Sequence, residues 1–213
     1  MKGNTLAIVL LVVGLIVGGG VGYFAAPRGT APGDGDGDGG PPTTVEVLPL
    51  EGQTVQLGYI SSTTVGLETA VPLVEDIMMV DYNNYAAKLG YDVDFEYLID
   101  DATSQAAVHL EKVQSYKAMD INIFIGGLWS SQAQAALSYC NDNDMLMWSS
   151  SSTSPLLAIA DDNLYRMCPT DLIQAPAIAR MLESHGIKAV IVIHRGDAWA
   201  DGIYNYFEPA FTE

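Results

Sequence analysis

The chain has 213 residues, and its 26 acidic against 9 basic side chains give a formal net charge of −17 at pH 7. This excess excludes a surface built to neutralise nucleic-acid phosphates or anionic lipid. Apolar residues make up 49% of the sequence, too many for a disordered chain. Two cysteines, Cys140 and Cys168, are too few for a disulfide scaffold or a four-thiolate zinc site. One optional disulfide remains, and two buried thiols are the simpler interpretation.

Residues 1–26 are predicted to anchor the chain in a membrane. Thr5 to Ala26 form a run of 22 residues without a charged side chain, and a membrane-spanning helix needs about 20 such residues. A cleaved secretory signal is the alternative, but its apolar stretch normally holds about 7–15 residues. Lys2 precedes the run and acidic residues follow it, which favours a body on the extracellular or periplasmic side.

Two patterns in the anchor allow other interpretations. Gly14, Gly18 and Gly22 have the small-xxx-small spacing that can bring two membrane helices together, although glycine is common in such helices anyway. The Lys2-Gly3 pair is similar to a prepilin-type processing site, which would make the helix an assembly element.

Residues 27–44 are predicted to be a solvated linker. Pro27 to Pro42 contain six glycines, four prolines and three aspartates, a composition that cannot form a core. The run from Asp34 to Gly39 matches the opening of a calcium-binding loop, but Val45 stands where the loop needs a bidentate glutamate. We therefore expect a self-repelling tether.

From Val45 onward the hydrophobic pattern alternates between strand and helix. The expected strands are 55–62, 93–99, 121–125, 145–148, 164–167 and 189–193. The expected helices are 68–89, 103–117, 130–141, 171–184 and 201–211. Gly90 should stop the first helix, and Thr103 or Ser104 should cap the second. Repeated strand–helix units predict an α/β fold with a doubly wound, mainly parallel sheet covered by helices on both faces.

Hydroxyl side chains gather after three of the predicted strands. Ser61 to Thr64 follow the first strand, Ser130 and Ser131 follow the Gly126-Gly127 turn, and Ser149 to Ser154 follow the strand at 145–148. A parallel sheet places these strand ends along one edge, where its ligands bind. Hydroxyls and the free N–H groups of a helix start suit a small carboxylate or phosphate. Capping is the competing explanation for each serine, although a cap needs one hydroxyl rather than four in a row.

The sequence lacks the patterns of nucleotide binding and of catalysis. It contains no Gly-x-Gly-x-x-Gly after the first strand, no P-loop and no Gly-x-Ser-x-Gly turn. His109 and His185 are expected at the surface or at a helix end. His194 borders the serine-rich edge, but as a base for Ser130 it has no carboxylate to orient it. No two histidines have the spacing of zinc ligands, so we expect no catalytic residue, no metal and no cofactor.

Four stretches together resemble a known family. IFIGGLWSSQAQAAL, MLMWSSSSTSPLL, LYRMCPTDLIQAPAIARML and AVIVIHRGDAWADG are similar, in order and spacing, to the type I periplasmic binding proteins and most of all to their leucine/isoleucine/valine-binding branch. The resemblance runs from about Val55 to the end of the chain. It implies two α/β lobes joined by a hinge, with lobe 1 over 45–168 and the hinge crossing and incomplete start of lobe 2 over 169–213. Such receptors close on an amino acid or similar solute and deliver it to an ABC transporter, and related ectodomains serve as sensors.

The resemblance also implies a set of ligand-binding residues, namely Ser130, Ser131, Ser151, Thr153, Asp171 and Trp199. Ser130 resembles the serine that binds the ligand carboxylate, and Ser151 and Thr153 match a loop that offers a carbonyl and a hydroxyl. Asp171 would help to hold the ammonium, and Trp199 takes the place of a pocket aromatic. The first loop, SSTTVGLETAVP, departs from the family pattern because it lacks a Gly-Pro followed by an aromatic residue.

The sequence thus favours an extracellular, membrane-tethered solute-binding protein, or a fragment of one, that captures an amino acid or amide-like solute for an ABC transporter permease. The alternatives are a ligand-sensing ectodomain that works with a signalling protein, and a filament or surface-layer component. A hydrolase using Ser130 and His194 is the least favoured, because no triad can be assembled. No nucleic-acid partner is expected. Family members extend beyond residue 213, so part of lobe 2 is expected to be missing.

Overall fold

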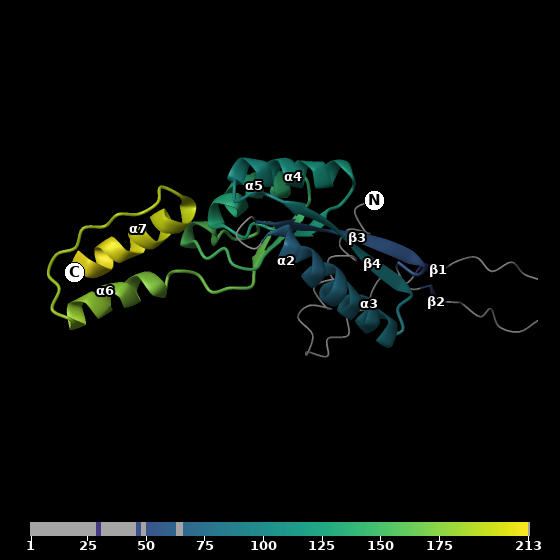
Figure 1. Ribbon diagram of the computed structural model, residues 1–213, viewed down its shortest axis with the longest axis horizontal. Helices are drawn as coiled ribbons and strands as arrows, with labels where there is room; N and C mark the ends of the chain where they lie inside the picture. The colour runs from purple at the N-terminus through teal and green to yellow at the C-terminus, as the bar shows by residue number, and fades with distance from the viewer. Residues whose placement is uncertain (1–28, 31–45, 48–49, 63–65, 213) are drawn as a thin grey trace, which may run out of the picture. The chain divides into compact units, whose positions relative to one another are not determined.

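The computed structural model describes residues 29–30, 46–47, 50–62 and 66–212 (Figure 1). The predicted membrane anchor, 1–26, lies outside these ranges, and so does most of the linker predicted at 27–44. None of the helices in the described ranges has the length and hydropathy that crossing a bilayer requires. Within the predicted linker and just after it, β1 (Gly29–Thr30) and β2 (Glu46–Val47) pair antiparallel.

Five strands form one sheet in the order β4-β3-β5-β6-β7. Their bounds are β3 Gln53–Ser61, β4 Val93–Asp101, β5 Ile123–Ile125, β6 Leu146–Ser149 and β7 Leu164–Arg166. The pairs β3–β5, β5–β6 and β6–β7 are parallel, which confirms the predicted α/β class and parallel sheet. From β3 the chain continues to β4 on one side of β3 and then crosses to β5 on the other side. The strand order therefore reverses between β3 and β5. In open α/β sheets the ligand crevice lies beyond such a reversal.

The helices agree with the predicted helical segments to within a few residues. They are α2 Leu67–Pro72, the π-helix η1 Leu73–Met78, α3 Met79–Lys88, α4 Ala106–Ala118, α5 Ser130–Asp142, the 3₁₀ turn η2 Pro155–Leu157, α6 Gln174–Ser184 and α7 Ala198–Thr212. Gly90 follows α3 with a φ of +81°, which confirms it as a helix stop. The predicted cap of α4 is wrong, because Gln105 occupies the N-cap position and Thr103 and Ser104 form a turn before it.

The described residues divide into two compact units, one made of 29–30, 46–47, 50–56 and 73–96 and the other of 57–62, 66–72 and 97–212. In the first unit, Asn83 on α3 bonds both backbone groups of Phe95 on β4. Its Nδ2 donates to Phe95 O at 3.2 Å, and Phe95 N donates to its Oδ1 at 2.6 Å. β4 is an edge strand, so this amide satisfies peptide groups that have no strand beside them.

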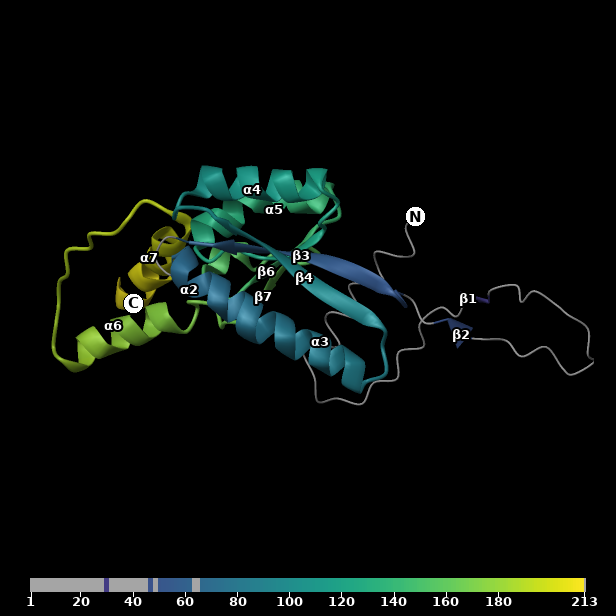
Figure 2. The ribbon, with the colours of Figure 1, turned by 45° about the vertical axis from the view of Figure 1, so that its right-hand side comes forward.

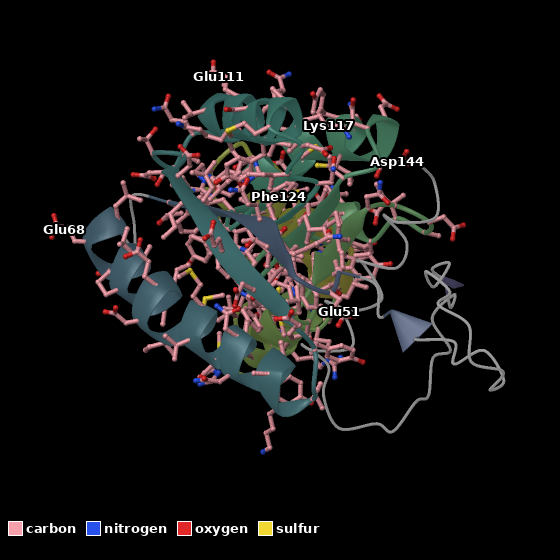
Figure 3. All side chains as sticks on the ribbon, turned by 90° about the vertical axis from the view of Figure 1, so that its right-hand side faces the viewer. Glu51, Glu68, Glu111, Lys117, Phe124 and Asp144 are labelled. Atoms are coloured by element: carbon pink, nitrogen blue, oxygen red, sulfur yellow. The ribbon has the colours of Figure 1, made fainter. Side chains whose placement is uncertain are left out.

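In the second unit, α4 and α5 lie side by side over the sheet, as Figures 1 and 2 show. The core between them and the sheet contains Tyr116, Phe124, Cys140, Met145 and Met147, all at most 1% exposed. Figure 3 shows Phe124 in this interior, whereas the side chain of Glu111 points outward from α4.

The strand predicted at 189–193 does not form in the described structure. Residues 187–195 belong to no helix or sheet, and Ile191 and Ile193 are each 93% exposed. A strand is held by hydrogen bonds to a neighbouring strand, and none of the described strands lies beside this segment. The flanking helices α6 and α7 pack on each other instead, through Ala175, Ala179 and Phe207.

Candidate functional site

A small cavity lies at the carboxyl ends of β3, β5 and β6, the place that the strand order marks for a ligand. It is lined by Tyr59, Ile60, Ser61, Ser62, Ile125, Gly126, Leu128 and Ser150. This confirms that the three serine-bearing strand ends meet at one edge of the sheet. We call it the carboxyl edge. The cavity volume is about 20 Å³. That volume holds roughly one water molecule, so an amino acid would need further walls around it.

Trp129 ties the loops after three strands together. Its indole Nε1 donates to Ser62 Oγ at 2.9 Å, and Ser62 Oγ lies 2.9 Å from Ser104 Oγ. Since the Ser62 oxygen accepts from the indole, its own proton is free to reach Ser104. Ser62 is fully buried and Trp129 half-buried, so this network fixes the indole ring at the rim of the cavity.

The loop after β4 stores backbone strain beside this network. Thr103 and Ser104 are consecutive non-glycine residues with left-handed φ angles of +48° and +57°. Each such residue costs on the order of 1 kcal/mol or more. Asp101 compensates in part, because its Oδ1 accepts from Thr103 N at 2.8 Å. Strained backbone of this kind is concentrated at functional sites, which favours the carboxyl edge as one.

His109 holds the Gly126-Gly127 turn from beneath. Its Nε2 accepts from Gly127 N at 2.8 Å, and a Cβ on Gly126 would lie 2.9 Å from the same nitrogen. The ring is fully buried, and its burial lowers the pKa of His109 from 6.5 to about 4. The expectation of a surface role for His109 is therefore wrong: a neutral imidazole supports the turn that leads to Trp129 and Ser130.

Most of the serine run after β6 is used to build the loop. Ser149 Oγ donates to Gly127 O at 2.7 Å, and Ser152 N donates to Ser149 Oγ at 3.1 Å. Ser154 Oγ donates to Ala198 O at 2.6 Å, at the start of α7. Ser150 is exposed and lines the cavity, and no partner for its hydroxyl occurs in the described part of the chain.

Three of the predicted ligand-binding residues already bond other protein groups or stand next to one that does. Ser130 is 2% exposed and accepts from Ser152 Oγ at 3.2 Å and from Ser154 N at 3.3 Å. Ser131 follows it in the first turn of α5 and is half-buried. Ser151 Oγ donates to Leu128 O at 2.6 Å. None of these residues lines the cavity itself.

Thr153 and Asp171 were predicted to act on the same ligand, and the structure places them together. Thr153 Oγ1 donates to Asp171 Oδ2 at 2.7 Å, and Asp171 N donates to Thr153 O at 2.9 Å. Asp171 is only 4% exposed. The pair joins the loop after β6 to the segment that leads into α6.

Trp199 lies in the first turn of α7 and is 40% exposed. The guanidinium of Arg195 lies over its ring and also over the ring of Trp129, with Cζ 5.8 Å and 5.9 Å from the two centroids. His194 stacks on Tyr204 with ring centroids 5.2 Å apart and lies 3.4 Å from Asp201. Among the described residues, no serine hydroxyl bonds His194.

The structure therefore adds residues to the site that lie outside the predicted set of ligand-binding residues, although Ser62 and Ser150 belong to the predicted hydroxyl clusters. Ser62, Ser104, Ser150, His109 and Arg195 shape the carboxyl edge or its surroundings. A signal existed for His109, because it shares the i, i+4, i+7 spacing of the buried Val113 and Tyr116. Arg195 had no such signal, because its contact with Trp129 joins residues far apart in the sequence.

The cysteines are both free thiols, one buried and one half-buried. Burial raises the pKa of Cys140 to about 12. Cys168 Sγ donates to Ser152 O at 3.3 Å, and burial is the main cause that raises its pKa. Among the residues that the structure describes, no group of three or more His, Cys, Asp or Glu side chains is placed to hold a metal ion.

Sequence comparison links most of this structure to one family of binding domains. The profile of the receptor family ligand binding region matches residues 77–213. An uncharacterized protein of Methanocaldococcus jannaschii is 32% identical over 127 residues, which are 57% of this chain and 30% of that protein. Glutamate receptor 2.8 of Arabidopsis thaliana is 28% identical over 146 residues, 68% of this chain and 15% of the receptor. The chain thus spans less than a third of the length of these relatives.

Solved structures share the fold at lower sequence identity. The leucine-binding protein LivK of Thermotoga maritima is 22% identical with a TM-score of 0.61, over 74% of this chain and 45% of that one. The branched-chain amino acid transporter protein LivJ of Streptococcus pneumoniae, in complex with isoleucine, is 18% identical with a TM-score of 0.60, over 75% and 47%. A solute-binding protein of R. palustris, in complex with 4-hydroxybenzoate, is 14% identical with a TM-score of 0.62, over 75% and 44%.

Proposed function

Because this chain belongs to the receptor family of ligand-binding regions and has the fold of type I periplasmic binding proteins, we propose that it binds an amino acid or amide-like solute at the carboxyl edge of its sheet. The observation that carries the proposal is the meeting of Ser61, Ser62 and Ser150 with the Gly126-Gly127 turn around one cavity. This edge coincides with the reversal of strand order, where such folds bind their ligands.

The edge offers the groups that a solute carboxylate needs. Ser150 carries an exposed hydroxyl without a partner in the described residues, and α5 begins nearby at Ser130. Ser130 accepts two hydrogen bonds and keeps its own O–H, which can donate to a carboxylate that reaches it. The N-terminal N–H groups of α5 add a partial positive charge. These groups favour the carboxylate end of a zwitterion at this edge.

The remaining predicted site residues have roles in the proposal as well. Ser151 and Thr153 stand on the exposed and half-buried part of the loop after β6, and Asp171 acts through its bond to Thr153. Trp199 supplies an aromatic wall from the start of α7. The cavity holds only about one water molecule, so the solute becomes enclosed when a second lobe closes on it. Binding of this kind involves no covalent chemistry.

In the cell, the protein would sit outside the membrane on its N-terminal anchor and pass the solute to an ABC transporter permease. The apolar run from Thr5 to Ala26 supports the tether. We infer a transporter as the partner by analogy with the solved proteins of the same fold, which include substrate-binding proteins of ABC transporters.

A sensing role is the second candidate. The similarity to glutamate receptor 2.8 of Arabidopsis thaliana covers 68% of this chain, so the same ligand-binding fold also occurs in a receptor. In that case the anchor would transmit the state of the ligand site to a partner in the membrane. The two candidates differ in the partner and share the solute site.

Calorimetry of the full-length protein against the common amino acids and their amides tests the shared step. We expect saturable heat with a subset of these solutes, and a loss of about tenfold or more in affinity for Ser150→Ala, since a hydrogen bond to a charged group contributes about 1.5–3 kcal/mol. Ser184→Ala on α6, whose hydroxyl bonds only its own helix and His185, is the matched control. An absence of heat with every solute would overturn the proposal.

A further inference from the structure

The guanidinium of Arg195 lies over two indole rings, those of Trp129 and Trp199, which we call the indole pair. Its Cζ is 5.9 Å from the centroid of Trp129 and 5.8 Å from that of Trp199. A cation within about 6 Å of an aromatic face is attracted by the ring quadrupole, and recognition of ligand cations is a common use of this attraction. A planar cation of the chain itself thus contacts the faces of both rings.

The indole pair adjoins the carboxyl edge. The Trp129 ring that faces Arg195 also donates its Nε1–H to Ser62, and Ser62 lines the cavity. A solute whose carboxylate reaches the serines would therefore extend its other end toward the two rings.

A fixed carboxylate completes the surroundings of this cation. Asp197 precedes α7 and caps it, because its Oδ1 accepts from Ala200 N at 3.0 Å. Its other oxygen forms an ion pair with Arg195 Nε. The Asp197 side chain is 14% exposed, whereas the Arg195 side chain is 59% exposed. The carboxylate is therefore held by the helix, while the guanidinium can leave into solvent.

The backbone around Arg195 allows that departure. Residues 187–195 belong to no helix or sheet, so moving Arg195 breaks no ladder of hydrogen bonds. If the guanidinium leaves, the two rings and the Asp197 carboxylate stay behind as an unfilled cation site. The net charge of −17 further favours the approach of cationic solutes over anionic ones.

We propose that the indole pair and Asp197 form the subsite for the cationic end of the ligand, and that Arg195 occupies this subsite until the ligand displaces it. The inference rests on the proposed solute-binding function and narrows its solute to amino acids with a guanidinium side chain. We infer a guanidinium because the side chain that now occupies the subsite is an arginine. A guanidinium is planar and weakly hydrated, and it pairs with a carboxylate while it stacks on rings. The ligand carboxylate then lies at the carboxyl edge.

Calorimetry of the full-length protein with L-arginine and L-citrulline tests the subsite, since citrulline has the same shape with a neutral urea group. We expect arginine to bind about tenfold tighter, because only its charged guanidinium gains a cation–π attraction from the rings and an ion pair with the carboxylate. Asp197→Asn keeps a residue that caps helices well but removes the charge, so it should lower the affinity for arginine and leave citrulline nearly unchanged.

Arg195→Ala gives the sharpest readout, because it removes the internal competitor. We expect arginine to bind about threefold tighter or more to this variant. The apparent affinity equals the intrinsic affinity multiplied by the fraction of molecules whose subsite is empty, and removing Arg195 raises that fraction. Arg180→Ala, an exposed charge on α6, is the matched control and should change nothing. Ligand binding should also alter the fluorescence of Trp129 and Trp199.

Four results would overturn the subsite, and the last of them would overturn the proposed function as well. Equal affinities for arginine and citrulline would show that the indole pair and Asp197 do not distinguish a charged side chain from a neutral one. Weaker arginine binding by Arg195→Ala would show that Arg195 contacts the ligand rather than competing with it. Binding of leucine without binding of arginine would remove this inference and leave the proposed function standing, whereas the absence of binding to every solute would remove both.

Discussion

Replacing Gly58 by alanine should destabilise the protein strongly, because the added carbon has no space. Gly58 lies on β3, and a Cβ there would be 2.2 Å and 2.5 Å from two ring carbons of Tyr116 and 2.7 Å from Phe124 Cβ. Real Cβ atoms do not approach other atoms below 3.0 Å, so neighbours must move. Both neighbours are buried, at 0% and 1% exposure, and have little space to move into.

Tyr116 resists displacement for a second reason. Its hydroxyl lies 2.9 Å from Leu98 O and 3.1 Å from Tyr59 O, so a shift of the ring takes the O–H away from two strand carbonyls. Overpacking costs about 1–3 kcal/mol, and a buried polar group without its bond costs about 1–3 kcal/mol more. We expect a total loss of about 3 kcal/mol, against a stability of about 5–15 kcal/mol for a folded protein.

Thermal unfolding of the full-length protein, followed by circular dichroism, measures this loss. About 3 kcal/mol corresponds to a fall in Tm of about 6–12 °C for a protein of this size. Gly196→Ala is the control, since nothing lies within 4 Å of its Cβ, and its Tm should move by less than about 2 °C.

The reasoning also predicts how a second substitution behaves. In a Tyr116→Leu background the ring is gone, so Gly58→Ala should cost less than half of what it costs in the native protein. Residues in contact give such non-additive changes. A fall in Tm below about 2 °C for Gly58→Ala alone, or an equal cost in both backgrounds, would refute the argument.

Three further predictions concern protonation, thiols and amide exchange. Burial lowers the folded-state pKa of His109 to about 4, so the unfolded chain binds a proton first as the pH falls. The free energy of unfolding should therefore decrease as the pH drops from about 6.5 to 4. His109→Gln should remove that part of the pH dependence, and an unchanged slope in this variant would contradict the prediction. A thiol reagent should modify Cys168 well before the buried Cys140, whose pKa is raised to about 12, and equal rates would show that Cys140 is accessible. Amides 188–194 should exchange with deuterium much faster than those of β6, and slow exchange would mean that the exposed Ile191 and Ile193 lie in a sheet.

The positions of the serine clusters were predictable, but the use of each hydroxyl was not. A strand–helix alternation places Ser62, Ser130 and Ser150 at one edge regardless of detail, because parallel strands all end there. Which of them faces solvent depends on the path of each loop. Ser130 turns inward to Ser152, whereas Ser150 remains exposed at the cavity.

Elements that depend on a distant partner were the ones that the sequence misjudged. The apolar run at 189–193 has the composition of a buried strand, yet a strand also needs a neighbour, and the described sheet supplies none. His109 was expected at the surface or at a helix end, but its face of α4 packs on the sheet and Gly127 supplies its hydrogen bond.

Hydrophobic periodicity, net charge and tertiary contacts thus determined different properties of this protein, each for its own physical reason. Periodicity determined the α/β class and the carboxyl edge, since the spacing of apolar residues is a local property that each helix or strand carries by itself. The acidity predicted that no polyanion is a partner, because net charge depends on composition alone. Only the tertiary structure decided that Arg195 lies over both Trp129 and Trp199, beside a carboxylate that α7 holds in place. Contacts of that kind join residues far apart in the chain, and their energies exist only once the chain has folded.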